Sequence, residues 1–299
     1  MLTELHRPPG PLARLTERLA AMAVPCPAHP AAHRIGAAAI EWSRAAGLGA
    51  DPADSAVHRL AARAFAGGEP GAAEMFARWL TWMSRIREEP GALAGILTVA
   101  AGGEPGPAPL ERSFAGLWES CVPGMDDAWR ERFLAGLAAQ HEALTAHEAP
   151  AGGVPSPGDC PGRARNAFGR YLFDLVEPCT GVQVPEPLRA SPRWRAVVEA
   201  SGDVAARCLD LATRDGRASA AAGFVERSTA VVTEEAVDRV ADRMEELWTA
   251  ARVIPVLVER HGLGFGPSRE VMRVVCAFLT ISRAHLEWLL ESPRYRHLE

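Results

Sequence analysis

The sequence predicts an all-α protein built as one domain of packed helices. Strand signals are nearly missing, because the chain has only two tyrosines and no alternating apolar runs bounded by Asn-Gly or Asp-Gly turns. Apolar residues instead recur at the spacing of one helix face. No segment between helices is long and polar enough to separate two domains. The 299 residues are therefore expected to form a single bundle.

Three stretches rich in glycine and proline divide the chain into about ten predicted helices. These breaks lie at 67–71, 90–109 and 149–162. We interpret 1–24 as an N-terminal arm and 25–299 as the helical domain.

The segment 126–148 is predicted to be an amphipathic helix. Its apolar residues recur at steps of four, four and seven positions, which places them on one face. They are Trp129, Phe133, Leu137 and Leu144. Asp126-Asp127 follows a glycine and precedes this helix, so we interpret the pair as its N-terminal cap.

Two long helices are predicted in the C-terminal third. The stretch 233–254 begins at Thr233, which can cap a helix, and two glutamates follow at its positive end. Its apolar stripe consists of Val237, Val240, Met244, Leu247, Trp248 and Ala251. The last helix is expected to begin at Ser268, after a Gly-Pro pair, and to run to about Leu290.

Composition argues against several classes of protein. A net charge of −5 and a pI of about 6.0 disfavour binding to nucleic acid or to an anionic membrane. No stretch reaches the roughly 18 apolar residues of a membrane span, and the apolar run 271–281 is interrupted by Arg273. The N-terminus lacks the apolar core of a signal peptide. We therefore expect a cytoplasmic protein.

The six cysteines are expected to be reduced thiols. They are scattered along the chain without a Cys-x-x-Cys pair, so neither a zinc site nor a disulfide framework is predicted. They are Cys26, Cys121, Cys160, Cys179, Cys208 and Cys276.

Short patterns follow one another along the chain in a defined order. They are His29-Pro30, Trp42, Ala46-Gly47-Leu48, the helix Glu74–Trp82, Phe114-Ala115-Gly116-Leu117-Trp118, Gly124-Met125, Ala128-Trp129, Asp174-Leu175-Val176-Glu177, Val184-Pro185, Glu287-Trp288 and Arg294-Tyr295. In their order and spacing, over about residues 25–296, they resemble the bacterial class I terpene synthases. The resemblance implies a single α-helical domain around a deep apolar cavity.

The resemblance also implies a reaction that depends on magnesium. In that family three Mg²⁺ ions ionise a prenyl diphosphate, and magnesium requires oxygen ligands. One set of ligands is an Asp-Asp-x-x-Asp motif, and the other is an Asn-Asp-x-x-Ser-x-x-x-Glu motif. The ligands of the second motif are four residues apart, on one helix face.

Neither metal motif survives in this sequence. The first falls on Ser84-Arg85-Ile86-Arg87-Glu88, where Glu88 is the only acid, and the ligand positions of the second become Leu209, Thr213 and Arg217. Two arginines beside such a cluster would repel it by several kcal/mol if partly buried. We therefore predict no metal site and no cofactor, although the family implies Mg²⁺.

Arginines stand around the predicted cavity mouth. Guanidinium groups can bind phosphate in a bidentate manner, so the mouth could hold an anionic head group through arginine alone. These residues are Arg85, Arg163, Arg217 and Arg294, with Tyr295 beside the last. The alternative, which we favour, is that Arg85 and Arg217 pair with Glu88, Asp210 or Asp215 and close a vestigial site.

Aromatic residues are candidates for the cavity wall, where they would stabilise carbocations. We single out Trp82, Phe173 and Trp288, and Leu209 and Thr213 complete the predicted substrate-binding set. For each aromatic residue the alternative is an ordinary core position.

Three functions remain open, and we favour the first. It is an enzyme of the terpene cyclase family that acts on a prenyl or terpenoid molecule without the three-magnesium cluster. Glu88, Asp203 and Asp210 are its candidate acids, because burial raises the pKa of a carboxyl group and suits it to proton donation. The second is a non-catalytic terpenoid carrier or a partner subunit. The third is a Mg²⁺-dependent synthase with displaced ligands. Assembly into a homodimer is also left open.

Overall fold

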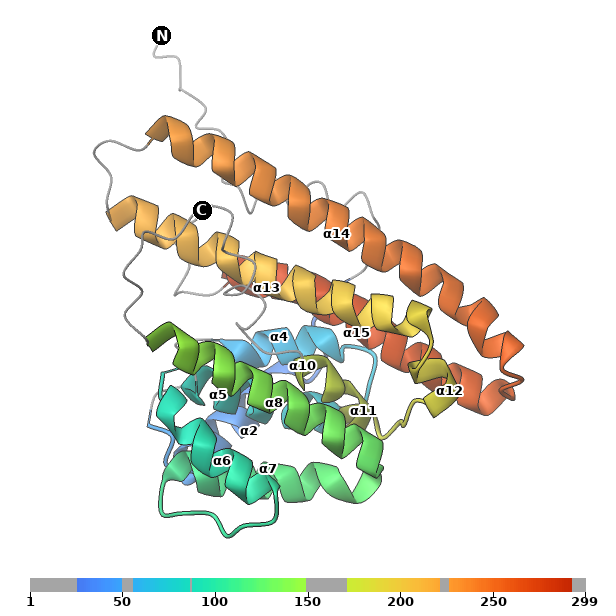
Figure 1. Ribbon diagram of the computed structural model, residues 1–299, viewed down its shortest axis with the longest axis horizontal. Helices are drawn as coiled ribbons and strands as arrows, with labels where there is room; N and C mark the ends of the chain where they lie inside the picture. Colours follow the sequence, from blue (N-terminus) through green and yellow to red (C-terminus); the bar gives the residue numbers. More distant parts are fainter. Residues whose placement is uncertain (1–25, 50–55, 87, 149–170, 221–225, 292–299) are drawn as a thin grey trace.

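The computed structural model describes residues 26–49, 56–86, 88–148, 171–220 and 226–291 (Figure 1). Every regular element in these ranges is helical, which confirms the all-α prediction. The α-helices are α2 (Ala32–Ala45), α4 (Val57–Ala64), α5 (Pro70–Ile86), α6 (Leu93–Ala100), α7 (Pro109–Cys121), α8 (Asp127–Glu148), α10 (Tyr171–Asp174), α11 (Val176–Thr180), α12 (Glu186–Arg189), α13 (Pro192–Ala220), α14 (Glu226–Arg260) and α15 (Phe265–Glu291). Two 3₁₀ turns, η1 (Pro90–Ala92) and η2 (Val122–Gly124), precede α6 and follow α7.

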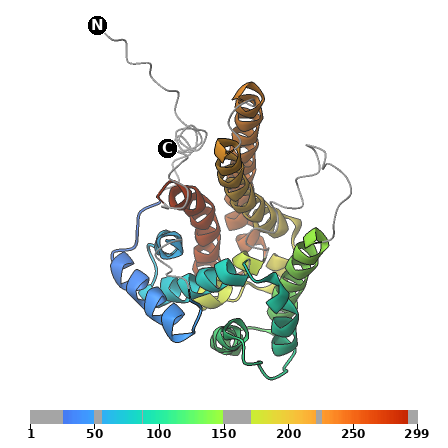
Figure 2. The same cartoon turned by 90° about the vertical axis from the view of Figure 1, so that its left-hand side faces the viewer.

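The three long C-terminal helices α13, α14 and α15 pack against one another. Helix α15 also packs on α4, which in turn packs on α2 and α5. Figure 2 accordingly shows α15 between the N-terminal helices and the pair α13–α14. The short helices α10, α11 and α12 connect α8 to α13 in this arrangement (Figure 1).

Helix α8 forms where the apolar stripe predicts it. The backbone N–H of Trp129 donates to Asp126 Oδ1 at 2.7 Å, so Asp126 caps the helix as expected. Trp129, Phe133 and Leu137 are fully buried. The predicted N-terminal cap and the buried face of this helix are thus confirmed, apart from Leu144, whose side chain lies outside the described part.

The predicted starts of the last two helices are wrong. Helix α14 begins at Glu226, ahead of Thr233, and continues through Pro255 to Arg260. A proline inside a helix removes one backbone hydrogen bond, and packing of the long apolar face on α13 and α15 compensates for that loss. Helix α15 begins at Phe265, so Ser268 lies inside the helix, where its Oγ donates to the carbonyl of Leu263 at 3.1 Å.

A short helix also occupies part of the predicted break 90–109. Helix α6 buries Leu93, Ile96 and Val99, which recur at helical steps of three. Glycine and proline are frequent on both sides of this eight-residue helix. For that reason its apolar pattern was not recognised in the sequence.

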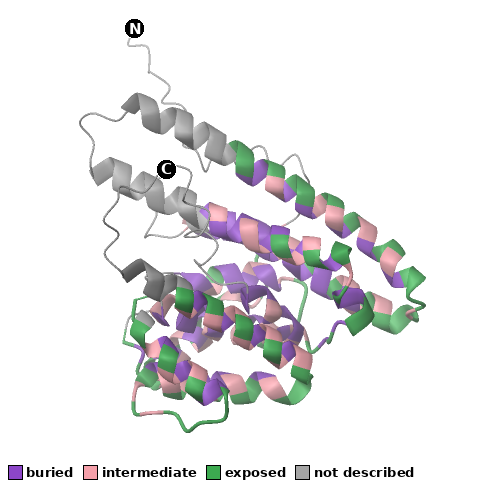
Figure 3. Cartoon of the chain, in the orientation of Figure 1, coloured by how far each residue is buried: buried purple, intermediate pink, exposed green. Residues whose placement is uncertain are grey.

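The N-terminal half is built around a continuous cluster of aromatic rings. Trp79 contacts Trp82, Phe114 and Phe133 at centroid distances of 5.8, 5.9 and 5.4 Å, and Phe133 contacts Tyr171 at 5.2 Å. Edge-to-face pairs of this kind add to the stability that burial provides. Buried residues gather in this interior, whereas exposed residues follow the outer faces of α8 and α14 (Figure 3).

Three further expectations concern the cysteines, membrane-spanning helices and the N-terminal arm. The five cysteines in the described ranges are free, as predicted for them; Cys160 lies outside these ranges. In the described part, no helix has both the length and the hydrophobicity needed to cross a membrane. The predicted arm 1–24 also falls outside the described residues.

Candidate functional site

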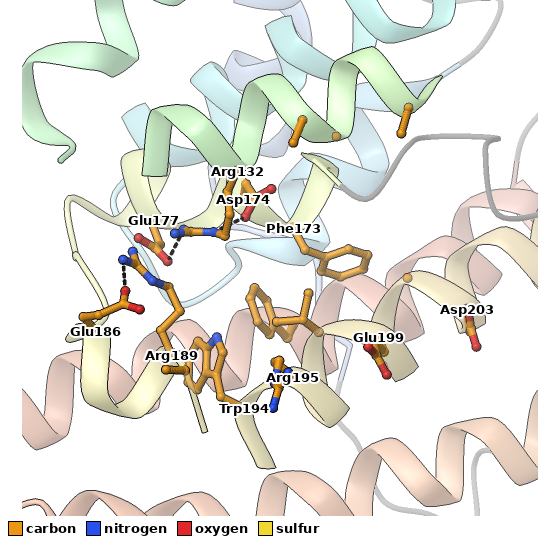
Figure 4. A pocket seen from close by; sticks show the side chains of 17 residues that line it. Arg132, Phe173, Asp174, Glu177, Glu186, Arg189, Trp194, Arg195, Glu199 and Asp203 are labelled. Carbon is orange, nitrogen blue, oxygen red and sulfur yellow. Dashed lines mark hydrogen bonds and ion pairs between the residues drawn. The ribbon is translucent and has the colours of Figure 1, made fainter. Parts of the chain in front are cut away.

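A pocket of about 500 Å³ opens between α8, the short helices α10 to α12, and the long helices α13 and α15 (Figure 4). Its size is in the range of sites that enclose small organic molecules. Charged side chains gather at the two ends of the pocket, and aromatic rings lie between these two groups (Figure 4).

Small residues on one face of α8 leave the space open. Ala135, Gly136 and Ala139 line the pocket; Ala139 lies four residues after Ala135 and three after Gly136, which places it beside both on the helix surface. At Gly136 an added Cβ would lie 3.1 Å from the Cβ of Tyr171, so glycine also permits the close approach of α8 to α10.

The opposite wall is aromatic. Phe173 of α10 contacts Phe278 of α15 at 5.4 Å between ring centroids, and Trp194 of α13 contacts Phe278 at 5.8 Å. All three rings line the pocket. Ser191 Oγ accepts a hydrogen bond from the Trp194 backbone N–H at 3.1 Å, so the Ser-Pro start of α13 sets the position of the Trp194 ring.

One end of the pocket holds a guanidinium shared between two carboxylates. Arg132 Nε lies 3.1 Å from Asp174 Oδ1, and Arg132 Nη2 lies 3.2 Å from Glu177 Oε1. Glu177 is only 4% exposed, and the Val184 backbone N–H is a further donor to its carboxylate. The residue lines the pocket (Figure 4), but its Oε2 is buried and closed off from the open space.

Burial shifts the pKa of both carboxyl groups upward. For Glu177, burial raises the pKa to about 7, against the opposing effect of Arg132 and with a further upward contribution from Asp174. For Asp174, burial raises the pKa and Arg132 lowers it in part. Taking a charged carboxylate out of water is costly, and a single arginine shared by two carboxylates does not fully offset this cost.

Arg189 of α12 lies beside this group. It is 7% exposed and forms ion pairs with Glu186 and, at 3.8 Å, with Asp126. Its Nη1 is buried without a partner in the described ranges. Because Asp126 also caps α8, Arg189 joins α12 to the start of α8.

At the other end of the pocket stand Glu199 and Asp203 of α13 (Figure 4). Asp203, one of the acids that the sequence suggests, thus lines the pocket. Its Oδ2 pairs with Arg243 of α14, at 3.1 Å from Nε and 3.0 Å from Nη2.

The residues that we aligned with the family's first metal motif lie away from this pocket. Arg85 forms ion pairs with Glu88 and Glu89, as the pairing alternative expects for Arg85 and Glu88. Neither Arg85 nor Glu88 lines the pocket, and Glu88 is exposed. Ser84 donates its hydroxyl hydrogen to the Leu80 carbonyl at 2.9 Å.

The three aromatic candidates lie in different parts of the structure. Phe173 lines the pocket. Trp82 is fully buried in the aromatic core, where its Nε1 donates to the Leu110 carbonyl at 3.0 Å. Trp288 packs edge-on against His285 at 6.3 Å and does not line this pocket.

Several predicted site residues fall where the structure describes no side chain. Arg163, Arg294 and Tyr295 lie outside the described residues, and of Leu209, Asp210, Thr213 and Arg217 only the helical backbone of α13 is described.

The sequence predictions missed most of the pocket's wall. The missed residues with a clear place in it are Arg132, Glu177, Arg189, Trp194 and Phe278. One signal was available, since Asp174 and Glu177 stand three residues apart in an otherwise apolar segment. Nothing local indicates that Arg132, more than forty residues earlier, faces both of them.

Comparisons with known proteins identify the family. The model of terpene synthase family 2, C-terminal metal binding, matches residues 70–250. The (-)-delta-cadinene synthase of Streptomyces clavuligerus is 28% identical over 257 residues, covering 74% of this chain and 76% of the enzyme.

Two solved structures share the fold. The linalool/nerolidol synthase from Streptomyces clavuligerus, in complex with 2-fluorogeranyl diphosphate, superposes with a TM-score of 0.71 at 24% identity, covering 89% of this chain and 97% of that one. Hedycaryol synthase in complex with nerolidol gives 0.68 at 17% identity, covering 88% and 96%. With the family model matching more than half of its length, this chain belongs to the class I terpene synthase family.

Proposed function

We propose that this protein is an enzyme of the terpene cyclase family that acts on a prenyl or terpenoid molecule without the usual three-magnesium cluster. The observation that carries the proposal is the open pocket of about 500 Å³ between α8 and α13. A family member that served only as a scaffold would have no need to keep an apolar cavity of this size bordered by acid groups.

The lining of the pocket suits a terpenoid. Phe173, Trp194 and Phe278 offer aromatic faces, which attract the positive charge of a carbocation. The small residues of α8 leave room for a branched hydrocarbon chain. Related folds bind molecules of this class: one solved structure holds 2-fluorogeranyl diphosphate and another holds nerolidol.

The residues at the family's metal positions do not fit three magnesium ions. Magnesium requires several oxygen donors, but the first motif offers Arg85, Ile86 and Arg87, and its one acid, Glu88, pairs with Arg85. By residue type the second motif offers Leu209, Thr213 and Arg217, of which only Thr213 carries an oxygen donor. No reaction step is therefore assigned to magnesium in this protein.

The test is a substrate panel measured with and without Mg²⁺. Purified protein is incubated with geranyl, farnesyl and geranylgeranyl diphosphates and with nerolidol, and the extracted products are identified by gas chromatography and mass spectrometry. We expect turnover of at least one terpenoid that is unchanged when a chelator removes divalent ions.

Two outcomes contradict the proposal. Turnover that requires Mg²⁺ identifies a conventional synthase with displaced ligands. Binding of nerolidol without any turnover across the panel identifies a carrier or partner protein.

A further inference from the structure

We propose that the pocket takes a terpenoid that carries a positively charged amine, with its apolar body against the aromatic wall and Glu199 as the counter-ion of its ammonium group. This inference rests on the proposed function, since it takes the pocket to be the substrate site, and it adds the chemical class of the substrate. The arrangement of charges around the pocket carries it.

Three guanidinium groups beside the pocket are each shared between two carboxylates. They are Arg132 with Asp174 at 3.1 Å and Glu177 at 3.2 Å, Arg189 with Glu186 and with Asp126 at 3.8 Å, and Arg243 with Asp203 at 3.0 Å and with Glu246. One guanidinium and two carboxylates leave one negative charge in excess when all three are ionised. The first two clusters stand at one end of the pocket and Asp203 of the third stands at the other (Figure 4), so both ends favour a cation.

The negative excess does not depend on the most buried cluster. Burial raises the pKa of Asp174 and of Glu177, so one bound proton would neutralise the cluster around Arg132. The clusters around Arg189 and Arg243 share no carboxylate with it, and their excess charge remains. The pocket therefore attracts a cation whether or not the buried pair holds a proton.

Glu199 is the lining carboxylate that is left for a ligand. It is exposed on α13, one helical turn before Asp203, and it forms no ion pair among the described residues. Arg195, one turn before Glu199, is also exposed and has no ion pair in the described ranges. Because the other lining carboxylates are paired with arginine, an ammonium group in this pocket finds its counter-ion at Glu199.

The rest of the lining suits the body of such a molecule. The aromatic wall formed by Phe173, Trp194 and Phe278 lies between the two charged ends (Figure 4), and ring faces attract an organic cation at close range. The small residues of α8 leave room for a branched hydrocarbon. A terpenoid amine satisfies both features, whereas a diphosphate would bring several negative charges to a lining that is already negative.

The test compares three ligands that share one ten-carbon body and differ in the head group, with the full-length protein and no added metal. They are geranylamine, which is positively charged near neutral pH, the uncharged geraniol, and the anionic geranyl diphosphate. Isothermal calorimetry and titration of the Trp194 fluorescence, assigned with a Trp194→Phe variant, measure the dissociation constants. We expect geranylamine to bind about tenfold more tightly than geraniol, and geranyl diphosphate to bind more weakly than geraniol.

Two exposed residues of α13 separate the contribution of charge from that of shape. Glu199→Gln should weaken the binding of geranylamine about three- to fivefold and that of geraniol by less than about twofold, because only the counter-ion is lost. Arg195→Gln removes a positive charge from the lining and should strengthen the binding of geranylamine about two- to threefold. Added salt should reduce the preference for geranylamine, since exposed charges are screened.

Glu74→Gln is the matched control. The change removes the same negative charge from the protein, but Glu74 pairs with Arg34 at 3.5 Å and does not line the pocket. The affinities of all three ligands should therefore stay unchanged. This control separates a local counter-ion from the net charge of the protein.

The possible failures are distinguishable. Equal affinities for geranylamine and geraniol, or geranylamine binding that Glu199→Gln leaves unchanged, would overturn this inference and leave the pocket as a site for a neutral terpenoid. Tightest binding of geranyl diphosphate, weakened by Arg195→Gln, would overturn it in favour of an anion site. Failure of all three ligands to bind would overturn both this inference and the proposed function. Binding of geranylamine that depends on Glu199, without turnover of any terpenoid, would support the ligand class and contradict the proposed enzyme.

Discussion

Glu177 lines the pocket, and its protonation is coupled to the stability of the fold. Its pKa is about 7 in the folded protein and near 4.5 when the chain is unfolded, so the folded state favours the protonated form. The stabilising contribution of this proton is complete below about pH 4.5 and is lost as the pH rises through about 7. A shift of this size corresponds to roughly 3 kcal/mol, as an order of magnitude.

Replacing Glu177 by Gln should remove that part of the pH dependence. We expect the free energy of unfolding of the wild type to decrease relative to that of Glu177→Gln between about pH 4.5 and pH 8. Urea unfolding at a series of pH values measures the difference, with Glu74→Gln as the control. Parallel curves for the wild type and Glu177→Gln would show that this carboxyl group titrates normally.

Residues whose role depends on local sequence were predictable, and those that depend on distant contacts were not. Asp126 and the stripe Trp129–Phe133–Leu137 follow from capping and helical spacing alone. The interactions of Arg132 with Asp174 and Glu177 join positions 42 and 45 residues apart, and no local pattern encodes them. The resemblance directed attention to the positions aligned with the family's metal ligands, whereas the pocket lies mainly against α8, α10 and the first half of α13.

At the scale of elements, the face of α8 determines whether the pocket exists. Ala139 lines the cavity and is exposed toward it, so a larger side chain there fills space without disturbing the buried stripe of the same helix. Ala139→Leu should reduce nerolidol affinity at least about tenfold and change the free energy of unfolding by no more than about 0.5 kcal/mol. Titration of the Trp194 fluorescence and urea unfolding measure the two quantities.

Ala37→Leu supplies the comparison for this change, because Ala37 is exposed on α2 and does not line the pocket. It should leave both quantities unchanged. Unaltered nerolidol binding by Ala139→Leu would place the ligand outside this pocket.

Helix boundaries were harder to predict than the helices themselves. The apolar stripe of α14 was recognised, but the predicted end at 254 falls one residue before Pro255, and the helix continues through that proline to Arg260. Its contacts with α13 and α15 stabilise the helix beyond the proline. Helix α6 shows the opposite error, since its short apolar segment was overlooked between glycine-rich turns. In both cases tertiary packing outweighs the local propensity.

At the scale of the whole molecule, Arg63 connects three distant parts of the chain. From α4 it forms an ion pair with Glu291 at the end of α15, and it donates to the carbonyl of Cys26 at 2.6 Å. Arg63→Met should lower the free energy of unfolding by about 1 to 3 kcal/mol, because a carboxylate and a carbonyl each lose a donor. Arg34→Met, at a more exposed pair, should cost less than about 1 kcal/mol. Equal effects of the two changes in urea unfolding would contradict a joining role for Arg63.

Ligand binding should also separate the proposed enzyme from a magnesium-dependent one through the stability of the whole domain. A ligand at one hundred times its dissociation constant stabilises the native state by about 2.7 kcal/mol, which raises the melting temperature of a domain of this size by roughly 5 °C or more. Nerolidol is expected to produce a shift of this order. Pyrophosphate with Mg²⁺ is expected to shift the melting temperature by less than about 1 °C, because the predicted alignment puts Arg85, Leu209 and Arg217 where the family has oxygen donors for the metal.

Differential scanning fluorimetry with each component alone and combined makes the comparison. A shift that requires both Mg²⁺ and pyrophosphate would mean that other oxygen donors bind the metal. A shift with pyrophosphate alone would mean that arginines bind the anion directly. Either result would show that the native protein binds an anionic group, because a ligand stabilises the native state only through contacts that the unfolded chain lacks.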